Sequence, residues 1–130
     1  MTPRDVPRPT DAELAILRVI WRLGSATVRE IHDALLQDQP KTGYTTVLKI
    51  LQIMTDKGIV VRDESQRAHV YAAKESEQST RGRLVRHLVD RAFDGSATAL
   101  VMQALSTKKA SPNELATIRA MLEKIEGERR

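Results

Sequence analysis

Hydrophobic residues recur three and four positions apart through two early segments of the chain, each of which opens with a capping box. In a capping box, a Thr side chain and a Glu three residues later satisfy the free backbone N–H groups at the start of a helix. Thr10 begins the first segment, which ends at Gly24, and Thr27 begins the second, which ends at Leu35. The pattern therefore predicts two consecutive amphipathic helices.

A third helix is predicted over residues 44–57, with Gly58 as its C-terminal stop. The spacing then changes from helical to strand-like. Residues 59–62 and 68–73 are rich in β-branched residues and alternate apolar with polar positions, around a polar turn at residues 63–67. The spacing within the third helix predicts a buried stripe consisting of Val47, Leu48, Leu51 and Met54.

This order of helix, turn, helix and hairpin is typical of winged-helix DNA-binding domains, which place the second helix of the motif in the major groove. We therefore predict a mostly α fold with a small β-hairpin wing, a winged helix-turn-helix domain over residues 10–75. Residues 1–9 contain three prolines and two arginines and are predicted to form a flexible N-terminal arm.

The remainder of the chain, residues 76–130, has a helical pattern throughout. Ser76 or Ser79 can cap its first helix, Ser96 can cap the second, and Ser111 followed by proline can cap the last. The last helix carries a narrow apolar stripe of the coiled-coil type. Helices this apolar cannot close a core alone, so we predict a C-terminal helical dimerisation arm and a homodimer. The residues expected at its interface are Leu84, Leu88, Leu100, Leu105, Leu115, Ile118, Leu122 and Ile125.

The bulk composition is that of a soluble globular protein, with 41% hydrophobic and 29% charged residues. No apolar run approaches membrane-spanning length, so no membrane association is expected, and a cytoplasmic location is favoured. The absence of cysteine excludes disulfides and thiolate metal sites. The net charge of +4 fits a polyanionic partner, but residues 1–75 are nearly neutral. Phosphate binding by the first domain would therefore need locally placed cations.

The N-terminus of the third helix holds side chains suited to reading base edges. Tyr44, Thr45 and Thr46 lie in its first turn, and Lys49 lies one turn further on the same predicted exposed face. A Thr can donate a hydrogen bond or present its methyl group to a thymine methyl, and a Lys can reach a guanine edge or a phosphate. The alternative interpretation is that Thr42 or Thr45 only caps the helix and that Lys49 is a solvated surface charge.

Basic residues elsewhere in the domain add further candidate DNA contacts. Arg67 and His69 in the hairpin are predicted to touch the DNA backbone or the minor groove, and Arg29 is predicted to contact a phosphate. Arg62 and Lys74 are secondary candidates. Any one of these residues taken alone is more often an ordinary surface charge than a DNA contact, so the argument rests on their clustering around one helix.

The residue inventory argues against an enzyme. The histidines His32, His69 and His87 fall in separate predicted elements, without the spacing of metal ligands. Neither a glycine-rich phosphate loop nor a nucleophile elbow is present, so no cofactor and no metal are expected. One Phe, one Trp and two Tyr are too few for a platform that stacks single-stranded bases. Double-stranded DNA is therefore the expected partner.

The chain carries four short segments in the order Thr27–His32, Tyr44–Leu48, Lys57-Gly58 and Arg67–Tyr71. Together they resemble the BlaI/MecI/CopY family of bacterial transcriptional repressors, and the similarity extends from about Thr10 into the last helix. The resemblance implies a homodimeric winged-helix repressor that binds an inverted-repeat operator and dimerises through its C-terminal helices. In the penicillinase-type branch it also implies control of β-lactam resistance genes and a pathway through a membrane sensor-protease.

Two departures limit what the resemblance implies. Copper-responsive members carry C-terminal Cys-x-Cys pairs, and a chain without cysteine cannot sense copper by that chemistry. Penicillinase-type members are cleaved at an Asn-Phe bond, whereas Gln103-Ala104 occupies the matching position here. The cleavage step is therefore not carried over.

Two other functions are compatible with the same fold. A winged-helix protein-interaction module would show no sequence preference and no strong salt dependence. A non-specific architectural DNA binder would bind DNA but would not discriminate between sequences.

Overall fold

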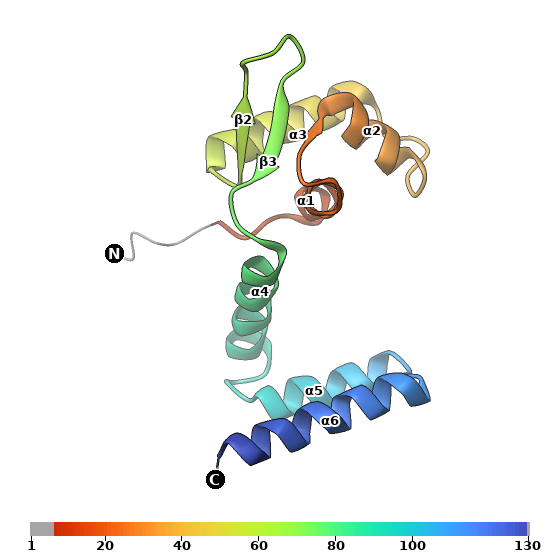
Figure 1. Ribbon diagram of the computed structural model, residues 1–130, viewed down its shortest axis with the longest axis vertical. Helices are drawn as coiled ribbons and strands as arrows, with labels where there is room; N and C mark the ends of the chain where they lie inside the picture. Colours follow the sequence, from red (N-terminus) through yellow and green to blue (C-terminus); the bar gives the residue numbers. More distant parts are fainter. Residues whose placement is uncertain (1–6, 130) are drawn as a thin grey trace, which may run out of the picture. The chain divides into compact units, whose positions relative to one another are not determined.

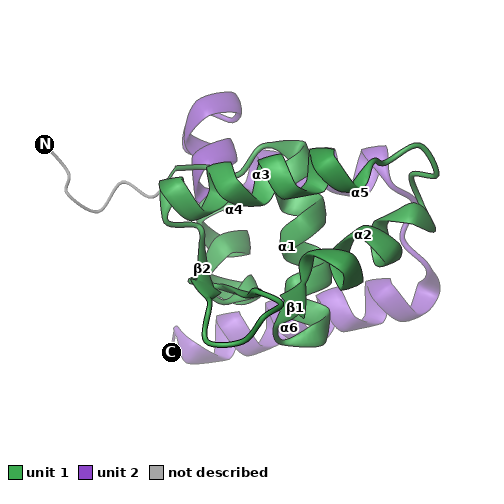
Figure 2. Cartoon of the chain, turned by 90° about the horizontal axis from the view of Figure 1, so that it is seen from above, with its two compact units in different colours: residues 1–84 green, residues 85–130 purple. Residues whose placement is uncertain are grey.

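A computed structural model describes residues 7–129, so most of the arm predicted over residues 1–9 lies outside the described residues. The chain divides into two compact units, residues 1–84 and 85–130 (Figure 2). The fold is mostly helical with one small antiparallel sheet, which confirms the predicted fold class (Figure 1). In chain order the elements are α1 (Asp11–Leu23), β1 (Ala26–Thr27), α2 (Val28–Leu36), α3 (Tyr44–Lys57), β2 (Val60–Asp63), β3 (Val70–Ala73), α4 (Glu77–Ala92), α5 (Ala97–Thr107) and α6 (Pro112–Glu128).

The predicted helix boundaries of the first unit are confirmed by their caps. The hydroxyl oxygens of Thr10 and Thr27 each accept a hydrogen bond from a backbone N–H three residues later, at 3.2 Å in both cases. In turn, the side chains of Glu13 and Glu30 accept hydrogen bonds from the backbone N–H groups of the two threonines, so both capping boxes are complete. α3 ends at Gly58, whose φ of +79° lies in the left-handed region that glycine adopts without strain.

The wing is the outer part of a three-stranded antiparallel sheet with strand order β1-β3-β2. Strand β1, which the sequence pattern did not predict, pairs Ala26 with Tyr71. The predicted strand limits were also wrong, because Ile59 and residues 68–69 fall outside the strands. The turn starts where the Asp63 carboxylate accepts the backbone N–H of Ser65 at 2.9 Å, and this local bond competes with the strand ladder. In Figure 1 the hairpin projects beyond the helices of its unit.

The core of the first unit lies between α1, α2, α3 and the base of the sheet. Its fully buried side chains include Ile16, Ile20, Ile31, Leu51 and Tyr71. Val47 and Met54 belong to this core as predicted, but Leu48 does not, because 43% of it is exposed. Positions 47, 51 and 54 follow the helical period that faces α1 and α2, and position 48 is turned away from that line onto the flank of the helix.

Two long-range polar contacts stabilise this arrangement. The indole Nε1 of Trp21 in α1 donates to the backbone oxygen of Glu75 at 3.0 Å, which ties the segment after β3 to α1. The Nζ of Lys57, the last residue of α3, donates to the carboxylate of Glu13 at 3.0 Å. The Trp21 side chain also packs against the core. The second contact joins the C-terminal end of α3 to α1.

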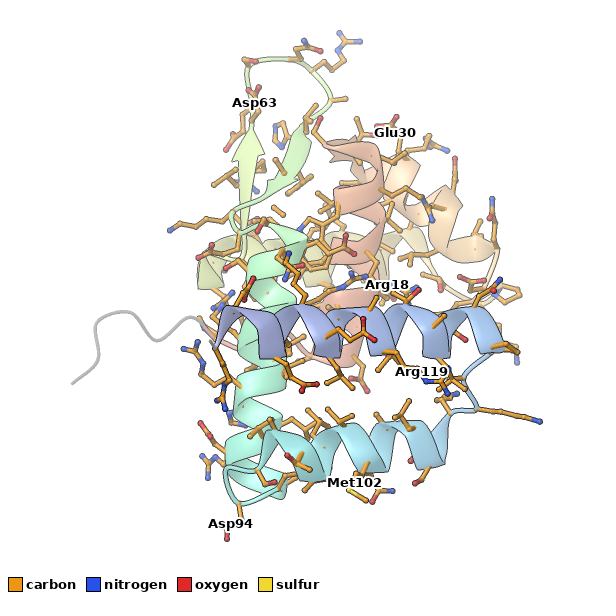
Figure 3. The ribbon with its side chains drawn as sticks, turned by 60° about the horizontal axis from the view of Figure 1, so that its bottom comes forward. Arg18, Glu30, Asp63, Asp94, Met102 and Arg119 are labelled. Atoms are coloured by element: carbon orange, nitrogen blue, oxygen red, sulfur yellow. The ribbon has the colours of Figure 1, made fainter. Side chains whose placement is uncertain are left out.

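The second unit consists of the remainder of α4 together with α5 and α6. Ser96 and Ser111 cap α5 and α6 as predicted, and Ser76 rather than Ser79 accepts the capping bond at the start of α4. No described residue of this unit is buried. Met102 of α5, 66% exposed, is one of its many exposed apolar side chains (Figure 3). Among the described residues, no helix combines the length and the apolar character needed to cross a bilayer.

Candidate nucleic-acid interface

The N-terminus of α3 has no side-chain cap. Its N-cap residue is Gly43, which has no side chain to accept the free N–H groups of the first turn. The hydroxyl of Thr42 instead donates toward the side-chain oxygen of Gln39 at 3.4 Å, and Thr45 lies inside the helix with its side chain exposed. The interpretation of Thr42 or Thr45 as a helix cap is therefore wrong. The free N–H groups can donate hydrogen bonds to a phosphate oxygen, and the helix dipole favours its negative charge.

The exposed face of α3 changes character along its length. Thr45 and Lys49 are exposed opposite the buried stripe, and Thr46 is exposed on its flank. Two turns further on, the amide of Gln52 donates to the carboxylate of Asp56 at 3.1 Å. A carboxylate repels phosphate, so this part of the face suits an anionic partner less well than the first two turns of the helix.

A groove of about 400 Å³ lies where the start of α2, the first turns of α3 and the wing turn meet. It is lined by four residues that were predicted from the sequence as separate DNA contacts, namely Arg29, Tyr44, Arg67 and His69. Thr45, Thr46 and Lys49 do not line it and lie on the adjoining face of α3. The lining consists of Thr27, Val28, Arg29, Tyr44, Leu48, Arg67, Ala68, His69 and Tyr71.

Tyr44 is held between two side chains of α2. The guanidinium carbon of Arg29 lies 5.7 Å from the centre of the Tyr44 ring, within the range of a cation–π contact. The ring of His32 meets the Tyr44 ring edge-on at 5.8 Å between centroids. These contacts place the Arg29 charge beside the uncapped N-terminus of α3, where a phosphate would bind.

His32 was not singled out as a site residue by sequence reasoning, although it positions the segment before α3. Its Nε2–H donates to the backbone oxygen of Thr42 at 3.1 Å, and its Nδ1 lies 3.2 Å from the Asp33 carboxylate. This bond fixes the turn that leads into Gly43. No spacing in the sequence signals such a contact, because it depends on how the turn of residues 37–43 folds back on α2.

In the wing, Arg62 links β2 to α3. Its Nη1 donates to the Gln52 side-chain oxygen and its Nε donates to the Glu64 carboxylate, each at 3.1 Å. The Tyr71 hydroxyl, followed by Glu64, raises the pKa of Arg62 above its ordinary value. Arg62 is therefore engaged within the protein and is a poor candidate for a DNA contact.

The other basic residues of the wing remain accessible. Arg67 lies exposed in the wing turn, and His69 is exposed with its Nε2 3.9 Å from the Glu64 carboxylate. Lys74 is exposed just after β3 but does not line the groove. Among residues 7–129, no cluster of three or more His, Asp or Glu side chains could hold a metal ion. The site therefore offers hydrogen-bond donors and cations to an anionic partner.

Comparison with known proteins places this geometry in a family. The chain is 29% identical over 118 residues to the transcriptional regulator BlaI of Mycobacterium tuberculosis, covering 89% of this chain and 83% of that protein. It is 24% identical over 123 residues to the penicillinase repressor of Bacillus licheniformis, covering 92% and 93% of the two chains.

The first unit also matches a solved structure. The solution structure of the DNA-binding domain of the repressor BlaI superposes with a TM-score of 0.50 at 26% sequence identity, covering 56% of this chain and 88% of that one. This match confirms the winged helix-turn-helix domain. The family model described as penicillinase repressor matches residues 9–124. The chain therefore belongs to the penicillinase repressor (BlaI/MecI) family of DNA-binding transcriptional repressors, which are not enzymes.

Proposed function

We propose that this repressor acts in the bacterial cytoplasm as a homodimer that binds an inverted-repeat operator in double-stranded DNA. The observation that carries the DNA-binding part is the uncapped N-terminus of α3, flanked in one groove by Arg29 and Arg67. Each protomer inserts α3 into a major groove, where Thr45, Thr46 and Lys49 meet base edges. The cations of α2 and of the wing contact phosphates on either side.

The exposure of the C-terminal helices supports the homodimer. Four of the predicted interface residues, Leu88, Leu105, Leu122 and Ile125, are each at least 39% exposed. The other four, Leu84, Leu100, Leu115 and Ile118, are half-buried. Apolar area left in water in this amount is unfavourable, and a second copy of the same helices would cover it. Such an interface would be two-fold symmetric, which matches an inverted repeat.

We propose residues 10–75 as the DNA-binding domain and residues 76–130 as the dimerisation domain. α4 runs from one compact unit into the other, so its first turns are packed with the winged helix. The dimer would space the two copies of α3 by about 34 Å, one turn of DNA. Repression would follow because the bound dimer excludes RNA polymerase from the promoter.

Genes of the antibiotic-resistance type are the candidate targets, since the Bacillus licheniformis relative is named penicillinase repressor. A membrane sensor-protease pathway of the penicillinase type would have to act differently here. Gln103 and Ala104 lie on the exposed surface of α5, where the resemblance would place the Asn-Phe cleavage pair. Loss of the dimer is the proposed route to derepression, because it removes the linked second half-site.

Fluorescence anisotropy on duplexes from upstream of its own and neighbouring genes tests this function, with scrambled duplexes of equal composition as controls. A preference of about a thousandfold for one palindromic segment near physiological salt is expected. Equal weak binding to every duplex would instead indicate an architectural DNA binder. Absence of binding would indicate a protein-interaction module.

A further inference from the structure

Leu48 is an exposed leucine in the part of α3 that faces the groove. It is 43% exposed, although its neighbour Val47 is buried in the core. It lies one turn beyond Tyr44 and directly before Lys49, within the first two turns of the helix. Exposed positions on the surface of a soluble helix are ordinarily polar, so a leucine at this position calls for a specific reason.

The surroundings of Leu48 give this exposed side chain a specific orientation. It lines the groove together with Arg67 and Ala68 of the wing turn and Arg29 of α2. Val28 and Tyr71, which line the same groove, are buried in the core. Leu48 and Tyr44 are therefore the large hydrophobic side chains that the described lining leaves exposed. The ring of Tyr44 is already engaged by Arg29 and His32, which leaves Leu48 as the aliphatic surface open to a ligand.

The major groove of DNA presents one apolar group on its base edges, the C5-methyl of thymine. A leucine cannot donate or accept a hydrogen bond, so thymine is the base that it can favour. We propose that Leu48 is a specificity-determining residue that packs against a thymine methyl in each half-site of the operator. This inference rests on the proposed function. It assigns the recognition of one base to a residue that the sequence pattern had placed in the core.

The thymine methyl can be removed without changing the rest of the base pair. Deoxyuridine keeps the Watson–Crick and major-groove polar atoms of thymine and lacks only the methyl. The operator would first be selected from a random 30-base-pair duplex library. Each thymine would then be replaced by deoxyuridine at symmetric positions in both half-sites, and affinity would be measured by anisotropy.

Three proteins would be compared on this set of duplexes. They are the wild type, Leu48→Gln, and the matched control Ile53→Gln. Ile53 is also on α3 and is 49% exposed, but it does not line the groove. Both substitutions replace an exposed side chain with a good helix former, so the fold is retained, and circular dichroism would verify this.

We expect uracil at one pair of positions to weaken wild-type binding by about tenfold, the value for two methyl groups losing apolar contact. Leu48→Gln should bind the unmodified operator about as weakly as the wild type binds the uracil-substituted operator. Its affinity should no longer change when uracil replaces thymine at those positions. Ile53→Gln should respond as the wild type does. A purely structural role for Leu48 would leave the response to uracil unchanged.

The two ways of failing are distinguishable. If the wild type selects an operator but Leu48→Gln keeps every uracil penalty of the wild type, the reading of thymine by Leu48 is overturned and the proposed function stands. If the wild type selects no sequence from the library, the sequence-specific function is overturned and this inference falls with it.

Discussion

Lys57, the last residue of α3, donates to the carboxylate of Glu13 near the start of α1 at 3.0 Å. Glu13 is 3% exposed, and its carboxylate also accepts the backbone N–H of Thr10 at 2.8 Å. One buried carboxylate therefore closes the capping box of α1 and anchors the C-terminal end of α3.

Replacement of Glu13 by Gln should destabilise the protein by about 1–3 kcal/mol at neutral pH, because Lys57 loses its charged acceptor while the amide oxygen of Gln can still accept the Thr10 N–H. The measurement is urea unfolding followed by circular dichroism. The matched control for the cap alone is Glu30→Gln, because Glu30 and Thr27 form the same kind of capping box at the start of α2. An equal loss in both variants would show that Lys57 adds nothing to the contribution of the cap.

The stability of the wild type should depend on acid pH through Glu13. Burial by itself would raise the pKa of Glu13, but the Thr10 backbone N–H and Lys57 lower it below its ordinary value of 4.5. A lowered folded-state pKa means that the stabilisation is present above about pH 4.5 and is lost as the pH falls through the folded-state value. Unfolding free energies measured from pH 6 to pH 3 should fall more steeply for the wild type than for Glu13→Gln. Parallel curves would contradict this role.

Lys49→Ala should weaken operator binding by about 1–3 kcal/mol if Lys49 reads a base, and this loss would be confined to the operator. A phosphate contact would give a similar loss on every duplex and would lower the slope of log affinity against log salt by about one. Salt titrations by anisotropy separate the two results. Lys124→Ala, on the exposed surface of α6, is the control. Affinity unchanged at all salt concentrations would remove Lys49 from the interface.

His32→Ala should lower operator affinity about tenfold while the domain stays folded, since it frees the turn before α3 and removes one side of the Tyr44 contact. Amide hydrogen exchange at residues 44–47 should also become faster. Gln39→Ala, which removes only the longer contact to Thr42, is the matched control and should change affinity less. A His32→Ala variant with wild-type affinity and exchange would refute the positioning role.

Leu122→Asp should convert the homodimer to a monomer, because it places a charge in the proposed apolar interface. Leu122 is 53% exposed in the single chain, so the substitution should not disturb the protomer. Light scattering after size-exclusion chromatography would report the mass. Glu126→Gln, one turn further along the exposed surface of α6, should remain dimeric. A dimeric Leu122→Asp variant would place the interface elsewhere.

Local signals explain what the sequence could predict. Thr10, Thr27 and Ser111 each begin a helix through a bond to a residue three positions away, so the capping boxes are readable without the fold. The glycines that end α1 and α3 act through their own backbone angles. Those signals place α3 after α2 and the wing after α3, and this order was sufficient to locate the candidate site.

The features that the sequence could not predict depend on distant residues. Strand β1 exists because Ala26 meets Tyr71, and two residues carry no strand periodicity. Leu48 fits an apolar stripe by spacing alone, and its exposure depends on where α1 and α2 stop covering α3. The contact of His32 with Thr42 likewise arises only after the intervening turn has folded.

The most direct test of the account is the dependence of affinity on the phase of the two half-sites. Binding of the wild type to the selected operator would be compared with binding to the same operator carrying five additional base pairs at its centre, which turns the half-sites to opposite faces of the duplex. A homodimer with two linked copies of α3 should lose at least a hundredfold in affinity, because the second half-site can no longer be reached. Equal affinity for the two duplexes would contradict a dimer that reads both half-sites at once.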